Sequence, residues 1–534
     1  MTALDAILQP EQRDALERVL ALAADLAGAW GARARASTTL ARERAILRLF
    51  GVAGVDDAGL PLASAVVERA IGNDQDRLAA GIALPFAVAL GEYELAPQAL
   101  ALDVASGALD LGLEAELLRE PTRRAAAEAE ARRLLRAAFD RVDANRSARL
   151  DLRGVLGDPA RPWLVATLDP ATLDLAVEEA GALVAAGADV VRVQTPAVRE
   201  LVLLLHDRGL EPHDWWPRGP DEPEEDPATI PAGSQRGLAV LRARLDEAGA
   251  EAGRYARLAT SASALAAPEQ ALVAVLERVD QVEADPLTEI VAGGVHPERA
   301  LADHAFAQRL LARAGTAVVV GPGPLVVGPD IARGVPSDPA TRAGRAFGLQ
   351  AIAVALARGN GLRPGELLAG AFVPWLAEER DPVVQAVAAA AVRRAAWPDV
   401  PLVFDEPDLS GAAGVRWPFL LALGLAVVDG GVVVGRRTPL AGLRAAVEQS
   451  RAAASVGAEL AAVGLVAPGR GPIDAQVAAL LAAAEATLRR LADEGWRSVV
   501  GEPLGGAGRD RLGAEAVVER ADTSDPFEVE LAAR

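Results

Sequence analysis

Four histidines, at positions 206, 213, 296 and 304, are the only imidazoles available for acid–base or metal chemistry. His296 and His304 are eight residues apart, so a helix would place both on one face, and Asp303 adjoins His304. Two histidines without a third well-placed ligand do not predict a metal site. His206 and Asp207 are sequence neighbours, which point in different directions on a helix and therefore do not predict an acid–base pair.

Lysine and cysteine are both absent, and their absence removes several kinds of chemistry. All 54 basic residues are arginine. A Schiff base with pyridoxal phosphate requires a lysine amine, so such a cofactor would need a lysine from another chain. Without cysteine there are no disulfides, thiolate nucleophiles or cysteine-based zinc and iron–sulfur sites.

Three carboxylates lie near the ends of predicted strands. They are Glu269, Asp285 and Asp405. Catalytic groups of barrel enzymes lie at the carboxyl ends of the strands, where a carboxylate can act as a general base. One open interpretation is therefore a barrel enzyme that uses these three groups. No Walker loop, GxSxG elbow or HExxH helix accompanies them.

Short apolar runs alternate with helical stretches from about residue 160, which is the pattern of a parallel sheet covered by crossover helices. The candidate strands are 163–168, 188–194, 255–259, 280–285, 316–321, 401–405 and 425–435. This pattern predicts an α/β fold. Seven or eight strand–helix units favour a (β/α)8 TIM-type barrel, and a doubly wound open sheet is the alternative.

The chain divides into three predicted regions. Residues 1–150 are rich in Ala, Leu, Arg and Glu at helical spacing and predict a helical N-terminal region. Residues 151–450 hold the TIM-like barrel, and 451–534 form a C-terminal helical region and tail. A proline- and acid-rich insertion at about 211–233 interrupts the barrel pattern and displays Trp215 and Trp216. It is either a solvated insertion or a lid or subunit contact.

Composition and charge exclude several classes of partner. The net charge of −20 and the pI near 4.8 disfavour nucleic acid, because phosphate contacts need a positive surface. Hydrophobic residues make up 51% of the chain, enough for a substantial core. The first residues are acidic where a secretory signal would be basic, and no apolar run predicts a membrane span. We expect a soluble cytoplasmic protein.

Three segments together carry a resemblance to a known family. Residues 37–70 contain a Thr-rich start, an ER..LRL.G helix, GVD and PL...VV. ANRSAR at 144–149 precedes the first predicted barrel strand, and 245–269 contains GRYARL, a serine and a PE pair. With GADVV at 187–191 and ADPL at 284–287, these matches keep the family's order and approximate spacing. The chain resembles the α subunit of D-lysine 5,6-aminomutase.

The resemblance implies a barrel subunit with helical extensions that works only with a partner. In that family a smaller β subunit carries adenosylcobalamin and the lysine that binds pyridoxal phosphate, so a lysine-free chain fits the α-subunit role. The implied activity is that of an isomerase, moving an amino group to the adjacent carbon of lysine or a related diamino acid by a radical mechanism. The barrel would hold phosphate and substrate and shield radicals from solvent.

The resemblance also implies site residues. Five would contact the cofactor: Arg257, Tyr255, Ser263, Ser234 and Thr195. Glu269 and Asp285 would bind substrate, and no catalytic residue is assigned. Arg257 could pair with a phosphate bidentately, with Tyr255 and Ser263 as neutral donors. The alternative is that Arg257 only bridges the barrel to a helix.

Several charged residues of the family pattern are replaced in this chain. Gln194 and Thr195 stand where the family has an Arg-Thr pair, with Arg192 two residues earlier. Gly293 and Gly294 stand where it has an Arg-Asp pair, and the proline-rich insertion replaces a glycine-rich stretch. Each change removes a group that would orient phosphate, ring or substrate. A second interpretation is therefore a diverged, non-catalytic paralogue that acts as a binding or scaffolding subunit.

Overall fold

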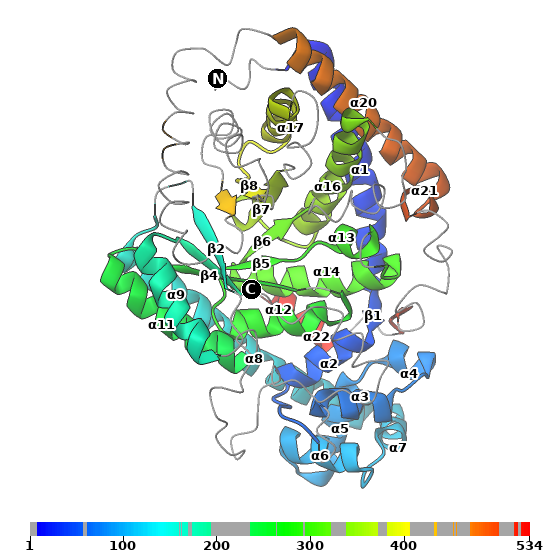
Figure 1. The fold of residues 1–534 in the computed structure, drawn as a ribbon. Helices are drawn as coiled ribbons and strands as arrows, with labels where there is room; N and C mark the ends of the chain where they lie inside the picture. The colour runs from blue at the N-terminus through cyan, green and yellow to red at the C-terminus, as the bar shows by residue number, and fades with distance from the viewer. Residues whose placement is uncertain are drawn as a thin grey trace.

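The structure is a computed structural model of the whole chain, shown in Figure 1. It describes residues 8–56, 61–159, 161, 163–168, 173–193, 235–262, 264–291, 294–321, 338–371, 382–405, 432–434, 452, 455, 470–500, 517–521 and 525–533. The insertion expected at about 211–233 lies outside these residues, together with Trp215 and Trp216.

Eight parallel strands close into a barrel at the centre of the molecule. They are β2 (Leu164–Leu168), β3 (Val190–Val193), β4 (Arg257–Ser261), β5 (Gln281–Glu283), β6 (Ala317–Val320), β7 (Leu367–Ala371), β8 (Leu402–Asp405) and β9 (Val432–Val434). Each strand pairs with the next, and β9 pairs with β2 to close the ring. The predicted α/β barrel is confirmed, and the open sheet that was its alternative is wrong.

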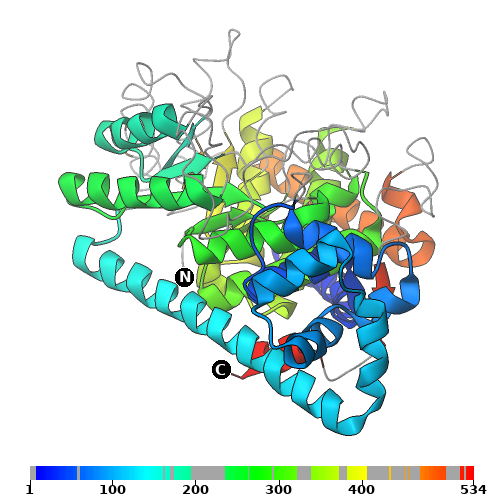
Figure 2. The ribbon, with the colours of Figure 1, turned by 90° about the horizontal axis from the view of Figure 1, so that it is seen from below.

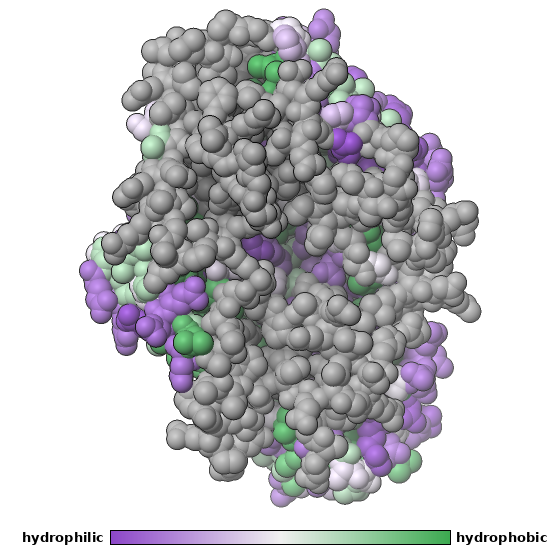
Figure 3. All heavy atoms as spheres, viewed as in Figure 1, coloured by the Kyte–Doolittle hydropathy of each residue, from purple (hydrophilic) through white to green (hydrophobic). Residues whose placement is uncertain are grey.

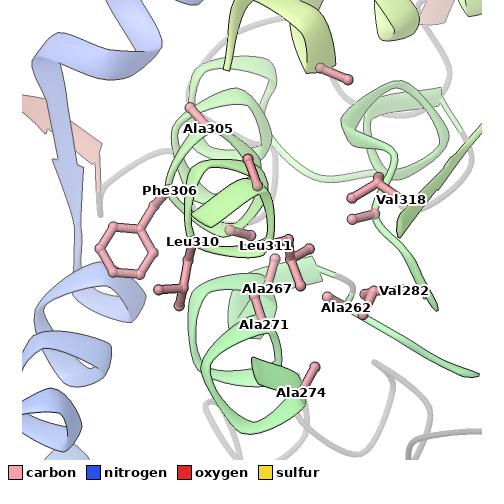
Figure 4. Packing of buried hydrophobic residues seen from close by; sticks show 14 of the residues in the cluster. Ala262, Ala267, Ala271, Ala274, Val282, Ala305, Phe306, Leu310, Leu311 and Val318 are labelled. Carbon is pink, nitrogen blue, oxygen red and sulfur yellow. The ribbon is translucent and has the colours of Figure 1, made fainter. Parts of the chain in front are cut away.

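Helices follow most of the barrel strands along the chain. They are α9 (Leu173–Ala186), α11 (Gln235–Ala252), η3 (Ala264–Ala266), α12 (Ala267–Leu276), α13 (Pro286–Val291), α14 (Pro297–Ala314), α16 (Pro339–Gly359), η5 (Pro364–Glu366) and α17 (Pro382–Ala396). Helix α14 is buried on nearly every side, because further helices cover its outer face. Alanines at the contact allow α12 and α14 to approach closely: Figure 4 shows Ala267 and Ala271 facing Leu310 and Leu311.

A helical region precedes the barrel. It comprises α1 (Pro10–Ala36), α2 (Leu40–Leu49), α3 (Leu62–Ala70), α4 (Gln75–Ala80), α5 (Ala83–Tyr93), α6 (Pro97–Ser106), α7 (Leu111–Glu114), η1 (Ala115–Arg119) and α8 (Pro121–Leu156). Thr39 begins α2 by accepting a hydrogen bond from the Arg42 N–H. The 36-residue helix α8 is the long cyan rod along the edge of Figure 2, and it leads directly into the barrel.

Segments from the N-terminal and C-terminal regions pair on the outside of the barrel. Strand β1 (Ser37–Thr39) pairs antiparallel with β10 (Val517–Glu519), and α22 (Pro526–Ala532) packs on α8. Helix α20 (Arg470–Glu494) lies beside α1 and α16, as Figure 1 shows in orange, blue and green, and α21 (Arg497–Val500) follows it. Helix α1 therefore packs against the barrel's own helices. The division of the chain near residues 150 and 450 stays a prediction.

The contact between α16 and α20 depends on a glycine. A Cβ at Gly344 would lie 2.4 Å from the Leu480 carbonyl oxygen and 2.6 Å from the Ala483 Cβ. We expect Gly344→Ala to lower the free energy of unfolding by about 1–3 kcal/mol, because two helix backbones must move apart. Gly28→Ala in α1 is the matched control, since a Cβ there meets nothing within 4 Å. The control substitution should raise the free energy of unfolding by about 0.5–1 kcal/mol. Urea unfolding of both variants measures the difference, and equal effects would contradict the close approach.

The helices of the described ranges were all considered for their length and apolar character as features of the fold. None of them combines the length and the apolar composition needed to cross a bilayer.

Candidate active site

A recess inside the barrel collects the polar side chains of the strands. We call it the barrel recess. Its lining residues are Val165, Arg192, Ala259, Thr260, Gln281, Glu283, Val319 and Val403. Its space for a ligand is about 20 Å³, which is room for about one water molecule. Hydrophilic residues also surface at the centre of the face drawn in Figure 3.

Two charged side chains face each other across the barrel recess. Arg192 is the third of four residues in β3, and Glu283 is the last residue of β5. The Arg192 guanidinium donates a hydrogen bond to Glu283 and forms an ion pair with it. Both side chains are partly exposed, at 21% and 39%. The pair therefore lies in the carboxyl-terminal half of the barrel, where TIM-barrel enzymes bind their ligands.

Gln281 brings an amide into the barrel recess. It shares a rung of the sheet with Arg192, because Ala259 pairs with both residues. The side chain is 5% exposed, and its Nε2 has no hydrogen-bond partner among the residues that the structure describes. A buried donor without an acceptor is costly in free energy, so this nitrogen is ready to bind an oxygen inside the recess.

An apolar layer fills the barrel interior next to the recess. It is a separate hydrophobic cluster of Trp163, Val165, Val190, Ala259, Leu368 and Val403. Side chains of alternate strands form such layers in TIM barrels and leave no pore. The recess thus has an apolar wall on one side and charged groups on the other.

Asp285 lies two residues after β5, at the carboxyl end of the barrel. Its oxygens accept hydrogen bonds from the Leu287 N–H, the Thr288 hydroxyl and the Gly321 N–H, at 2.9, 3.0 and 2.9 Å. Burial raises the pKa of Asp285, and these donors oppose that rise. A Cβ at Gly321 would lie 2.9 Å from the Asp285 Oδ2, so the close approach requires a glycine. Asp285 is on the expected face, and its substrate-binding role stays a prediction.

Glu269 lies in α12 and is paired with a residue of the N-terminal region. Its Oε1 is 2.5 Å from the Nε of Arg44 in α2. Burial raises the pKa of Glu269, while the guanidinium of Arg44 opposes that rise. Arg44 and Arg299 also donate to the Leu265 carbonyl, at 3.1 and 3.4 Å. Glu269 thus helps to fix the loop that follows β4, and its predicted contact with substrate remains untested.

Arg257 and Tyr255 lie at the opposite end of the barrel. Arg257 begins β4, its Nη2 is 2.5 Å from the Asp158 Oδ1, and its guanidinium lies 3.7 Å from the Trp163 ring centroid. The Tyr255 hydroxyl donates to Asp280 at 2.9 Å, and burial is the largest cause that raises the pKa of Tyr255. Asp158 follows α8, so this placement favours the interpretation in which Arg257 bridges the barrel to a helix.

Several predicted residues lie outside the described ranges. They are Thr195, Ser234, Ser263, Gln194, Gly293, His206 and His213. Asp405 ends β8, where its backbone pairs with Val434. The cofactor contacts expected of Thr195, Ser234 and Ser263 therefore stay predictions.

His304 and Asp303 are both buried in α14. Asp303 accepts hydrogen bonds from Thr39 and Arg299 at 2.5 and 2.6 Å. Within the described ranges, neither ring nitrogen of His304 has a hydrogen-bond partner, and burial lowers its pKa to about 3. His296 precedes the first residue of the same helix. The Asp303 carboxylate therefore already accepts hydrogen bonds that connect β1 to α14.

The pKa of His304 predicts an acid-sensitive fold. The unfolded chain binds a proton near the ordinary value of 6.5, whereas the folded chain does so only near 3. Stability is therefore lost as the pH falls from 6.5 towards 3, by about 2 kcal/mol between pH 7 and 5 from this group alone. Denaturant unfolding of wild type and His304→Leu at both pH values measures this. The variant should lose less stability between them, and identical losses would contradict the assignment.

Three residues of the recess were not proposed as binding groups from the sequence. Gln281 and Glu283 lie within the predicted strand 280–285, and Arg192 within 188–194. The available signal was alternation: polar residues at positions 281 and 283, spaced by two, must share one face of a strand. In a barrel covered by helices, that face can be the interior.

A closed barrel of eight parallel strands, with helices between them along the chain, defines a TIM-barrel protein. A family model described as the D-lysine 5,6-aminomutase TIM-barrel domain of the α subunit matches residues 11–409. The chain belongs to this family, which confirms the resemblance.

Two curated relatives are lysine 5,6-aminomutase α subunits. The protein from Fusobacterium nucleatum is 29% identical over 294 residues, covering 54% of this chain and 51% of the relative. The protein from Acetoanaerobium sticklandii is 28% identical over 285 residues, covering 53% and 51%. The chain spans about half the length of the curated relatives it matches.

Solved structures add only a weak likeness. Dihydropteroate synthase from Anaplasma phagocytophilum is 12% identical, with 56% of this chain and 98% of that chain covered, at a TM-score of 0.35. That score is too low to bear on function.

Proposed function

We propose that this chain is the barrel subunit of an aminomutase that moves an amino group to the adjacent carbon of lysine or a related diamino acid. The observation that supports the proposal most is the family's barrel model, which matches residues 11–409, and inside that barrel Arg192, Glu283 and Gln281 bring a cation, an anion and an amide together. Amino-acid substrates carry charges of both signs, and the recess offers a partner for each.

The cofactors of the proposed reaction are pyridoxal phosphate and adenosylcobalamin. The unpaired Gln281 Nε2 in the recess fits a bound ligand with an acceptor oxygen. Thr195, Ser234 and Ser263 would supply hydroxyls to the phosphate. The pyridoxal ring would delocalise electrons from the migrating amine, and the cobalamin would supply the initiating radical. Because this chain contains no lysine, the Schiff-base lysine must come from the partner.

The described residues would contribute positioning and shielding. Asp285, whose oxygens accept three hydrogen bonds at the carboxyl end of the barrel, would bind a substrate ammonium. Glu269 and Arg44 hold the loop after β4 in place. The apolar layer beside the recess excludes water from the barrel interior, which protects reactive radicals. A small cobalamin-binding subunit would cover the carboxyl end of the barrel.

Co-expression with the small partner subunit tests the proposal. We expect a stable complex and, with pyridoxal phosphate, a visible Schiff-base absorption that shifts when D-lysine or ornithine is added. Asp285→Asn should weaken the amino-acid shift while the complex and its absorption remain. A complex whose absorption does not respond to any diamino acid would contradict the proposal. That result would favour the diverged binding or scaffolding subunit, the role suggested by the loss of family charges at Gln194 and Gly294.

A further inference from the structure

We propose that Gln350 and Arg393 are positioning residues, which hold Asp285 in place from behind the barrel strands. Gln350 lies in α16 and Arg393 in α17, and both helices pack beside β7 (Figure 1). Neither residue stands out in the sequence, and neither lines the barrel recess. The inference rests on the proposed function in one respect, because Asp285 is the group that would bind a substrate amine.

The two side chains bind the carboxyl ends of β6 and β7. The Gln350 Nε2 donates to the Gly370 carbonyl at 2.8 Å and to the Val320 carbonyl at 3.4 Å. Val320 is the last residue of β6, and Gly370 is the last but one of β7. The Arg393 Nε donates to the Gln350 Oε1 at 2.8 Å and to the Gly370 carbonyl at 3.3 Å. Arg393 therefore fixes the Gln350 amide in the orientation that holds both strand ends.

Hydrogen bonds connect these strand ends to Asp285. The Gly370 N–H donates to the Gly321 carbonyl at 3.1 Å, and the Gly321 N–H donates to the Asp285 Oδ2 at 2.9 Å. A Cβ at Gly321 would lie 3.7 Å from the Gln350 Cα, so α16 packs closely behind this glycine. Because these groups are in direct contact, a displacement of Gly370 would also move Gly321 and the Asp285 carboxylate.

A second buried glutamine holds the residue before Asp285. Gln308 in α14 donates from its Nε2 to the Ala284 carbonyl at 3.0 Å, and Asn360 donates to the Gln308 Oε1 at 2.9 Å. Gln308 and Gln350 are 0% and 1% exposed. Each is an amide that is bound at its oxygen and donates to a carbonyl at a strand end. Two helices thus use the same arrangement on the backbone that surrounds Asp285.

Stability alone does not explain a buried arginine at position 393. The residue is 0% exposed, and within the described ranges no carboxylate pairs with it and its Nη2 has no hydrogen-bond partner. Burial lowers the pKa of Arg393 to about 9, so the guanidinium is still charged at neutral pH. An unpaired buried cation lowers stability, and an apolar side chain of similar size would often be more favourable there. Such a cost is typical of residues that serve a functional site.

Hydrogen exchange of the free, full-length chain tests the inference without cofactor or partner. Gln350→Glu keeps an oxygen that accepts from Arg393 but removes the N–H groups that donate to the two strand ends. The amides of Gly321 and Leu287, which both donate to Asp285, should then exchange about tenfold faster or more. Gln308→Met should accelerate the same amides, and it replaces Gln350→Glu if that variant does not fold.

The matched control is Gln12→Glu in α1. Gln12 is also a buried glutamine, and its Nε2 donates to the Asp474 carbonyl at 2.9 Å. This substitution should leave the exchange of Gly321 and Leu287 unchanged. Thermal unfolding shows whether each variant is folded.

A double-mutant cycle in the complex with the small subunit separates positioning from stability. Gln350→Glu should raise the D-lysine concentration that half-saturates the absorption shift about tenfold or more, because a misplaced carboxylate binds an amine less well. In an Asp285→Asn background the same substitution should add less than about twofold, since it acts through Asp285. A residue needed only for stability would give the same factor in both backgrounds.

Two results would overturn the inference. One is unchanged exchange of Gly321 and Leu287 in both Gln350→Glu and Gln308→Met. The other is an equal effect of Gln350→Glu on the D-lysine response with and without Asp285→Asn. Failure of the proposed aminomutase would look different, because the wild-type complex would not respond to any diamino acid while exchange in the free chain still responded to both substitutions.

Discussion

Replacing Glu269 with Leu is expected to lower the free energy of unfolding by about 3–5 kcal/mol. Glu269 and Arg44 are 1% and 6% exposed as side chains, and their Nε and Oε1 atoms are 2.5 Å apart. Removing the carboxylate leaves the Arg44 cation buried beside α12 without its closest anion. Denaturant unfolding of the full chain measures the loss.

The double variant Arg44→Met with Glu269→Leu gives the decisive comparison. A buried ion pair replaced by apolar groups of similar size often costs little, so the double variant should recover most of the stability. Arg133→Gln, on the surface of α8, should change stability by less than about 1 kcal/mol. If Glu269→Leu is as stable as wild type, the pairing with Arg44 is not what the structure describes. If the double variant is stable and still loses amino-acid binding, Glu269 has the predicted substrate role as well.

Arg42→Met is expected to have the second large effect, again about 3–5 kcal/mol. Arg42 is 6% exposed as a side chain and forms ion pairs with Glu43 and Asp525, and its guanidinium lies 5.6 Å from the Phe527 ring centroid. Although burial raises the pKa of Asp525, Arg42 and Arg520 lower it further, so the carboxylate is charged in the folded protein. Without Arg42, the buried carboxylates of Glu43 and Asp525 would lose the positive charge that pairs with both of them.

The loss of stability should appear first in β10 and α22, which pack against the N-terminal region. Hydrogen exchange of β10 and α22 is expected to accelerate in Arg42→Met, while exchange in the barrel strands stays near wild type at low denaturant. Arg520→Met should give a smaller effect, because Arg520 is more exposed, at 15%. Uniform exchange across the molecule would contradict a local role for Arg42.

Most of the barrel followed from local sequence pattern. The valine-rich strands, such as 190–193 and 317–320, stand out because β-branched residues favour a pleated, buried backbone. Strand β7, LLAGA at 367–371, was missed because Leu, Ala and Gly give no strand preference, and its pairing with β6 and β8 sets its conformation. The β1–β10 ribbon was also missed, since it joins segments from opposite ends of the chain.

The site was harder to predict than the fold, and the reason is register. The predicted strand 255–259 placed Arg257 in mid-strand, whereas β4 runs from Arg257 to Ser261. Because the strand begins two residues later than predicted, the Arg257 side chain keeps its predicted face of the sheet but lies at the amino end of the barrel. Asp285 was predicted at the end of strand 280–285, and it lies two residues after β5, at the same end of the barrel. Glu283 and Gln281 were overlooked because polar residues inside a strand usually face solvent.

The central claim is that this lysine-free barrel works with a partner as an aminomutase. The most direct test incubates the complex of the full-length chain and its small subunit with both cofactors and isotopically labelled D-lysine, and follows the position of the nitrogen by NMR. The account predicts a positional isomer in which one amine has moved to the adjacent carbon, with no product when either chain is left out. A folded, cofactor-loaded complex that leaves D-lysine, L-lysine and ornithine unchanged would contradict it.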